Sequence, residues 1–145
     1  MKELRFSDVP DGWALCFNGE CLRQGRCLRY RAGVLAPNDF TVSRCVTPKA
    51  LLGGACPHFT PIATARYAKG FTHIYDQVLK NDYTPLRKTM TEHLQNKRYY
   101  YAYMRGERLL SPAQQQWITD LFAQHGYTKG PFFDDFEEVY EFPRI

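Results

Sequence analysis

The cysteines of this chain are concentrated near its N-terminus, where their spacing favours metal binding. Cys16, Cys21 and Cys27 follow one another as Cys-x4-Cys-x5-Cys, and Cys56 comes after a longer gap. Thiolates are soft ligands suited to zinc or to iron–sulfur clusters, and four of them complete a tetrahedral site. Three ligands close in sequence and one remote ligand would fasten a loop to a distant segment. We therefore predict that these four cysteines bind one metal centre.

Zinc is the expected cofactor, because a structural zinc site needs only four closed ligands. Neither short gap has the length of the Cys-x2-Cys pairs of standard zinc knuckles, so metal-free reduced thiols stay an alternative. Cys56-Pro57 is similar to the Cys-Pro ending of ferredoxin sequences, which keeps an iron–sulfur or thiol redox role open. Basic side chains nearby would offset the thiolate charge: Arg23, Arg26 and Arg29.

Two further residues near this set are not expected to be ligands. Cys45 lies in a predicted strand and lacks a Cys–His signature, so we expect a buried core thiol. His58 lies two residues beyond Cys56 and is expected at the surface, because the four cysteines already close a tetrahedron.

Length and composition predict one folded domain in a reducing compartment. The chain has 145 residues, 15% aromatic residues and a formal net charge of +4. We expect a single domain, residues 1–145, with a cysteine-rich subregion at 1–60 and a helix and strand subregion at 61–145. The charged opening and the lack of a long apolar run predict a cytoplasmic protein with no membrane partner. Five cysteines in such a compartment argue against a disulfide framework.

Two helices carry clear start signals in the second half of the chain. Thr84 followed by Pro85 predicts a helix that runs to about Asn96. Ser111 and Gln114 form a predicted capping box, and Gly126 is expected to end that second helix. Its predicted apolar stripe consists of Trp117, Ile118, Leu121 and Phe122.

The remaining elements are shorter and complete a predicted α+β fold. We expect a small mixed or antiparallel sheet packed by amphipathic helices, with a cysteine-rich, metal-stapled N-terminal segment. Helices are predicted at Cys27–Leu35 and Thr72–Leu79, and strands at Phe40–Val46, Ala65–Phe71 and Glu137–Phe142.

A stretch that interleaves arginines and tyrosines offers a different function. Four tyrosines in six residues favour a strand over 98–105, followed by a turn at Gly106 and a returning segment at 107–110. Aromatic rings on one face of a sheet can stack on bases while arginines hold phosphates. A structural strand covered by a helix is the favoured interpretation, because the RNP1 pattern is absent. The nucleic-acid alternative uses Arg98, Tyr99, Tyr101, Tyr103 and Arg105.

The sequence resembles an uncharacterised family of domains from Bacteroidales-type bacteria. That resemblance spans most of the chain and implies a shared scaffold without an assigned activity. It rests on Gly12-Trp13-Ala14-x-Cys16, Cys21, Cys27-Leu28-Arg29, Cys56-Pro57-His58-Phe59, Thr72-His73 and Arg105-x-Glu107-Arg108-Leu109-Leu110-Ser111-Pro112.

No phosphate-binding loop, nucleophile elbow, His-Glu-x-x-His motif or dinucleotide fingerprint occurs in the sequence. We therefore expect a non-enzymatic, metal-stabilised binding or adaptor domain. Its partner is undefined at this point, with a protein partner open and nucleic acid not favoured. An iron–sulfur or thiol redox protein is the remaining alternative.

Overall fold

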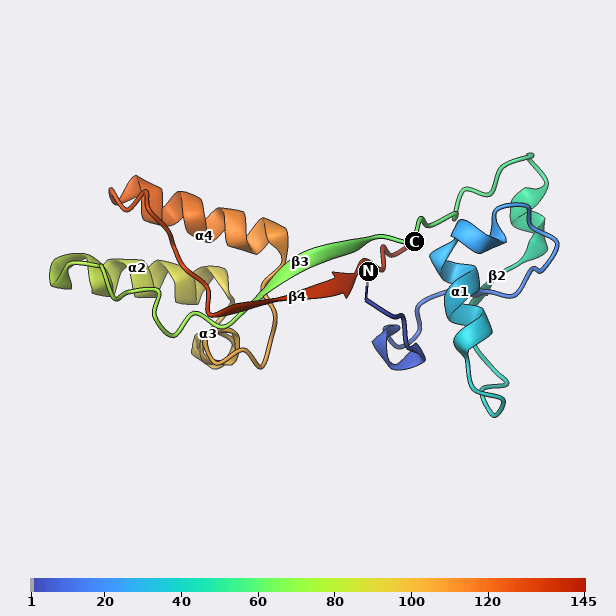
Figure 1. Ribbon diagram of the computed structural model, residues 1–145, viewed down its shortest axis with the longest axis horizontal. Coiled ribbons are helices and arrows are strands. Elements are labelled where there is room, and N and C mark those ends of the chain that lie inside the picture. The colour runs from blue at the N-terminus through green and yellow to red at the C-terminus, as the bar shows by residue number, and fades with distance from the viewer. Residues whose placement is uncertain (1) are drawn as a thin grey trace. The chain divides into compact units, whose positions relative to one another are not determined.

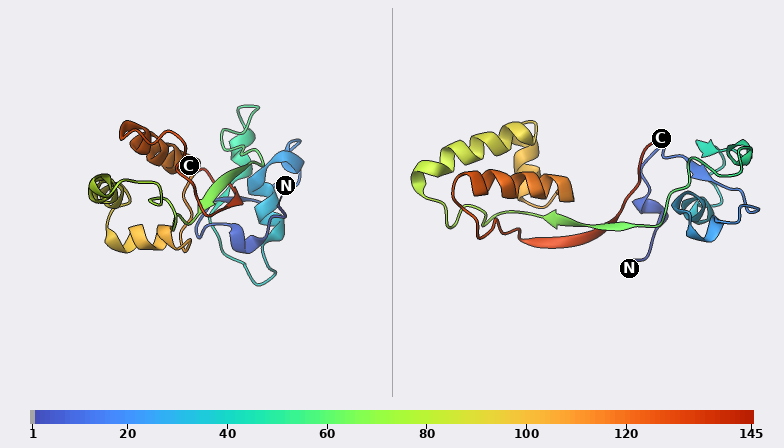
Figure 2. Two further views of the ribbon diagram at one scale, coloured as in Figure 1. Left: turned by 60° about the vertical axis from the view of Figure 1, so that its left-hand side comes forward. Right: turned by 90° about the horizontal axis from the view of Figure 1, so that it is seen from above.

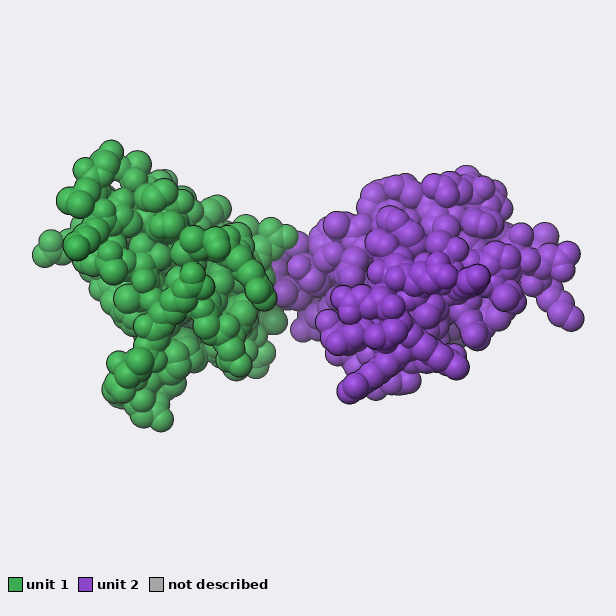
Figure 3. All heavy atoms as spheres, turned by 180° about the vertical axis from the view of Figure 1, so that it is seen from behind, with its two compact units in different colours: residues 1–64, 140–145 green, residues 65–139 purple. Residues whose placement is uncertain are grey.

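The computed structural model describes residues 2–145, which form two compact units (Figure 3). Unit 1 contains residues up to Thr64 together with Tyr140–Ile145, and unit 2 contains Ala65–Val139. The division falls close to the predicted boundary at residue 60, but the last residues of the chain return to unit 1. The assignment of the chain to one domain stays a prediction.

Unit 1 is built from short elements around a small apolar core. Strand β1 (Leu15–Cys16) pairs in parallel with β2 (Cys45–Val46), and helix α1 (Leu28–Leu35) packs against β1. Three 3-10 turns complete it: η1 (Phe6–Asp8), η2 (Gln24–Arg26) and η3 (Pro48–Leu51). The buried core consists of Leu4, Trp13, Leu15, Leu28, Ala32 and Tyr140.

A second two-stranded sheet consists of β3 (Thr64–Lys69) and β4 (Asp135–Tyr140), which run in opposite directions (Figure 1). Beyond the strand ends, the backbone N–H of Glu141 donates to the carbonyl of Ala63 at 3.0 Å. A single antiparallel bridge also joins Ala68 in β3 to Leu110.

Unit 2 places three helices around the larger core (Figures 1 and 2). These are α2 (Lys80–His93), α3 (Lys97–Met104) and α4 (Pro112–Gln124), and α2 packs against both of the others. Each helix contributes an apolar face, and this burial stabilises the unit. The core consists of Ala68, Phe71, Ile74, Leu86, Met90, Leu94, Tyr100, Tyr103, Leu110, Ile118, Leu121 and Phe122.

The expected α+β class is confirmed, and so are the elements with strong local signals. The capping box of α4 forms as predicted, with Ser111 and Gln114 exchanging bonds of 2.9 and 3.2 Å. Gly126 follows that helix with a φ of +89°, a backbone conformation that favours glycine. Strand β3 and helix α1 lie within one residue of their predicted starts.

The tyrosine-rich stretch is a helix, so the prediction of a strand at 98–105 was wrong. Asn96 caps α3, because its side-chain oxygen accepts a bond of 3.0 Å from the backbone N–H of Tyr99. Tyr100 and Tyr103 are buried three residues apart, which matches a helical face rather than an alternating strand. The cap and this spacing outweigh the strand preference of tyrosine.

The predicted start of α2 at Thr84 was also wrong, because the helix begins at Lys80 and Pro85 lies inside it. The phenol oxygen of Tyr127 accepts a bond of 3.0 Å from the backbone N–H of Leu79 and donates to Asp82 at 2.5 Å. A residue distant in sequence therefore provides the hydrogen bonds at the start of this helix. Signals in the local sequence do not reveal such a partner.

Three other predicted elements differ from the structure. The strand expected at 40–46 is reduced to Cys45–Val46. The segment 72–79 forms turns instead of a helix. The amides of Ile74, Asp76 and Val78 donate to carbonyls three residues back, while those of Thr72 and Leu79 donate to the side chains of Asp134 and Tyr127. The segment 107–110 contributes only the bridge from Leu110 to β3, instead of a hairpin strand.

Truncation of the α4 core face should destabilise the protein. Leu121 is 7% exposed, so Leu121→Ala should lower the free energy of unfolding by about 2–5 kcal/mol through lost burial and a residual cavity. Urea denaturation followed by circular dichroism measures this change. Gln124→Ala, at an exposed position of the same helix, is the control and should change it little. Equal effects of both substitutions would contradict the assigned helix face.

Candidate metal centre

The first two cysteines are placed by β1 and by the turn that follows it. Cys16 ends β1, whose pairing with β2 fixes its backbone. The side-chain oxygen of Asn18 accepts a bond of 3.1 Å from the N–H of Glu20, and the carbonyl of Asn18 accepts one of 3.3 Å from the N–H of Cys21. This local turn reverses the chain and brings Cys21 back toward β1.

Helix α1 and the segment after η3 position the other two cysteines. Cys27 immediately precedes α1 and forms an antiparallel bridge with Pro61. The next backbone N–H, of Leu28, donates to the carbonyl of Thr60 at 2.7 Å. These contacts hold the segment that carries Cys56 beside the start of α1.

The four cysteines line one small cavity of about 30 Å³ in unit 1. A cavity of this size can hold a water-sized group. The other lining residues are Arg23, Gln24, Arg29, Tyr30, Val46, His58 and Phe59. The structure therefore brings together the four cysteines that the spacing singled out.

Two of the cysteine sulfurs accept hydrogen bonds from the backbone N–H of the residue two positions later in the sequence. The N–H of His58 donates to Sγ of Cys56 at 3.4 Å, and the N–H of Asn18 donates to the sulfur of Cys16. Donors directed at sulfur favour its anionic form. Thiolate is also the form that binds a metal ion.

Arg29 lines this cavity and is a buried positive charge, with 3% of its surface exposed. Its guanidinium donates to the carbonyls of Ala14, His58 and Pro143 at 2.7, 3.0 and 3.1 Å. It also lies over the ring of Trp13, 4.3 Å from the centroid. Within the described residues 2–145 it forms no ion pair with a carboxylate, so the nearby sulfurs are the groups that can neutralise it.

The pKa values of Cys16 and Arg29 are each shifted by effects that act in opposite directions. Burial raises the pKa of the Cys16 thiol, the N–H of Asn18 lowers it, and the proximity of Cys27, Cys21 and Cys56 raises it. Burial lowers the pKa of Arg29, whereas negative charge on Cys27 and Cys56 would raise it. The net result at Cys16 is a raised pKa, so burial and the neighbouring sulfurs together oppose the ionisation of this thiol.

The cysteine side chains around the cavity are not arranged in the geometry of a metal site. Among residues 2–145, no group of three or more His, Cys, Asp or Glu side chains has an arrangement that could hold a metal ion. All five cysteines are free thiols. The role of Cys16, Cys21, Cys27 and Cys56 as metal ligands accordingly stays a prediction.

Cys45 and His58 differ from their expected positions. Cys45 is exposed and does not line the cavity, so the prediction of a buried core thiol was wrong, because β2 is only two residues long and leaves this side chain uncovered. His58 is half-buried and lines the cavity beside Cys56, to which its backbone donates.

The tyrosine-rich stretch does not present the row of exposed rings that the nucleic-acid alternative requires. Tyr103 is buried in the core of unit 2, whereas Tyr99 and Tyr101 are half-buried. Arg105 is held by two bonds of 2.9 and 3.1 Å to the carboxylate of Glu107. The guanidinium of Arg108, which the sequence argument did not include, lies 4.4 Å from the ring centroid of Tyr99. The sheet face required for base stacking is therefore not formed.

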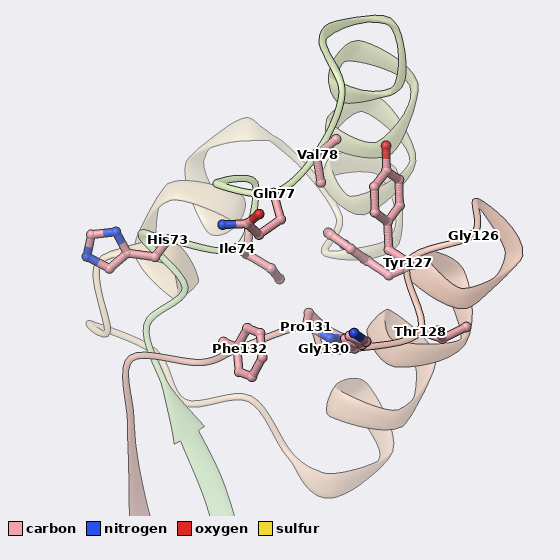
Figure 4. Close-up of a pocket in the computed structure, with 12 residues that line it drawn as sticks. His73, Ile74, Gln77, Val78, Gly126, Tyr127, Thr128, Gly130, Pro131 and Phe132 are labelled. Carbon is pink, nitrogen blue, oxygen red and sulfur yellow. The ribbon is translucent and has the colours of Figure 1, made fainter.

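A separate cavity of about 340 Å³ lies in unit 2, between segments 73–78 and 126–132 (Figure 4). Ile74, Val78 and Phe132 give it an apolar lining. The ring of His73 points away from the cavity in Figure 4, and its Nδ1 lies 3.0 Å from the carboxylate of Asp76. We find no nucleophile and base paired inside this cavity among the described residues.

The chain belongs to DUF6078, a family of unknown function whose model matches residues 1–142. The expectation of an uncharacterised family is thereby confirmed, while the bacterial group and the cysteine pattern of that family stay predictions. No curated protein and no solved structure matches the chain. Within the described residues, no helix is both long and apolar enough to cross a lipid bilayer.

Gly33 is a site residue that the cysteine spacing does not reveal. A Cβ at this position of α1 would lie 2.3 Å from the carbonyl oxygen of Cys16. Only glycine therefore permits this approach of the helix to the strand end that carries the first cysteine.

Gly33→Ala should for this reason lower the free energy of unfolding by about 1–3 kcal/mol, although alanine usually stabilises a helix. Urea denaturation measures the change. Gly25→Ala is the matched control, because a Cβ there meets no atom within 4 Å. A Gly33→Ala protein as stable as the Gly25→Ala protein would show that the close approach is absent.

Proposed function

We propose that unit 1 is a structural metal site in which Cys16, Cys21, Cys27 and Cys56 bind one zinc ion. The observation that carries this proposal is that the four cysteines, from separate segments, line one small cavity. In the metal-bound state each sulfur would lie about 2.3 Å from the zinc.

The surroundings of the cavity support thiolate ligands. Arg29 supplies a buried positive charge, and Arg23 lies at the rim, with Nη2 3.5 Å from the carbonyl of Cys56 and its guanidinium over the ring of Phe59. Zinc with four thiolates has a net negative charge, which these guanidinium groups would partly neutralise. The N–H donors at Cys16 and Cys56 act in the same direction.

The ligand set favours zinc over an iron–sulfur cluster, because a structural zinc site needs only four closed ligands. Four cysteine ligands would also leave no open position on zinc for a substrate. We therefore propose a non-enzymatic, metal-stabilised binding or adaptor role for the protein.

Elemental analysis of the freshly purified chain tests the proposal. We expect about one zinc per chain, and we expect each of Cys16→Ser, Cys21→Ser, Cys27→Ser and Cys56→Ser to lose most of it, because each removes a ligand. Cys45→Ser is the matched control and should keep the zinc, since Cys45 is exposed outside the cavity.

Two outcomes would contradict this assignment. A chain free of zinc, even after refolding with added zinc under reducing conditions, would leave the cysteines as thiols only. A brown protein that contains iron and acid-labile sulfide after anaerobic purification would establish the iron–sulfur alternative instead.

A further inference from the structure

Unit 1 contains a second cavity, of about 480 Å³, on which three arginines converge. Arg29 comes from α1, Arg44 immediately precedes β2, and Arg144 lies beyond β4. This volume is in the range of small-molecule sites. The other residues that line it are Pro10, Asp11, Gly12, Trp13, Ala14, Phe142 and Ile145.

Arg29 lines this cavity and keeps bonding capacity beyond its three backbone partners. A guanidinium carries five N–H groups, and the carbonyls of Ala14, His58 and Pro143 use three of them. The remaining two lie on the terminal nitrogens, which form the fork that recognises carboxylate and phosphate groups. Because Arg29 is nearly completely buried, this fork is also fixed in position before a ligand arrives.

Arg44 and Arg144 add charge that the described residues do not neutralise. Both are exposed, and within residues 2–145 neither forms an ion pair with an acidic side chain. Asp11 is the single acidic side chain that lines the cavity. Like charges gathered in one place repel, and an anion bound among them would remove that repulsion.

The walls of the cavity are partly apolar. Trp13 packs edge to face against Phe142, with ring centroids 5.0 Å apart, and Pro10 lies at the same cavity. The indole N–H of Trp13 is already bonded to the carbonyl of Pro143 at 2.8 Å. These rings therefore offer an apolar surface next to the charged groups.

We propose that this cavity binds a small phosphate monoester, with the phosphate held by Arg29, Arg44 and Arg144 and the organic group against Phe142. A phosphate monoester carries about 1.5–2 negative charges at neutral pH, opposite in sign to the arginines that line this cavity. The cavity is larger than a phosphate alone requires, which leaves room for the organic group. This site is distinct from the cysteine cavity, although Arg29 lines both.

Calorimetric titration of the zinc-loaded chain with phenyl phosphate tests the inference. We expect saturable binding of one equivalent, and we expect the double variant Arg44→Gln/Arg144→Gln to bind about tenfold or more weakly, because two charge-assisted contacts are lost. Within residues 2–145 neither side chain forms a hydrogen bond or an ion pair, so the substitutions remove no such contact from the fold. Arg31→Gln, an exposed position of α1 outside the cavity, is the matched control and should bind as the parent does.

The site is overturned if the parent chain shows no saturable binding, or if Arg31→Gln weakens binding as much as the double variant does. The second result would indicate general attraction to a basic surface. Titration with phenol, which lacks the phosphate, should show no binding, and phenol binding as tightly as phenyl phosphate would also contradict the proposal. The zinc content of every variant is measured in parallel, so that failure of the metal site and failure of the phosphate site are distinguished.

Discussion

The buried guanidinium of Arg29 is the interaction on which unit 1 depends. Its three bonds join α1 to the backbone before β1, to the segment after Cys56 and to the last residues of the chain. Burying a charge is unfavourable by several kcal/mol unless an opposite charge lies close. No carboxylate among the described residues fills that role, whereas the sulfurs of Cys16, Cys27 and Cys56 are near enough to interact electrostatically. The same residue therefore organises the backbone around the cysteines.

Local chemical signals predicted the secondary structure well where they did not compete with tertiary contacts. Ser111 with Gln114 defined α4, and the residues after Cys27 defined α1. The preference of tyrosine for strands misled at α3, since the Asn96 cap and burial of Tyr100 and Tyr103 on one helical face decide that conformation. The early start of α2 depends on Tyr127, which no sequence window around that helix contains.

The candidate site likewise contains residues that the sequence predicted and residues that only the structure identified. Soft ligands at close spacing are visible in a sequence, so Cys16, Cys21, Cys27 and Cys56 could be selected before their positions were known. The other residues of the two cavities are recognised only from contacts between segments that are distant in sequence. Gly33 is required by its approach to the carbonyl of Cys16, and the convergence of Arg44 and Arg144 depends on β2 and on the return of the chain after β4. Such contacts leave no local pattern.

The division of the chain makes unit 2 an insertion within unit 1, entered through β3 and left through β4. Tyr140 and Phe142, which pack into the core of unit 1, follow the whole of unit 2 in the sequence. During synthesis the cysteine-bearing segment thus emerges first but lacks its last core residues until the inserted unit is complete. Because domains tend to fold as units while the chain emerges, the helical insertion can fold before the unit that contains it. The apolar core of unit 1, unlike the cavity lined by the cysteines, is therefore completed only after the inserted unit has been synthesised.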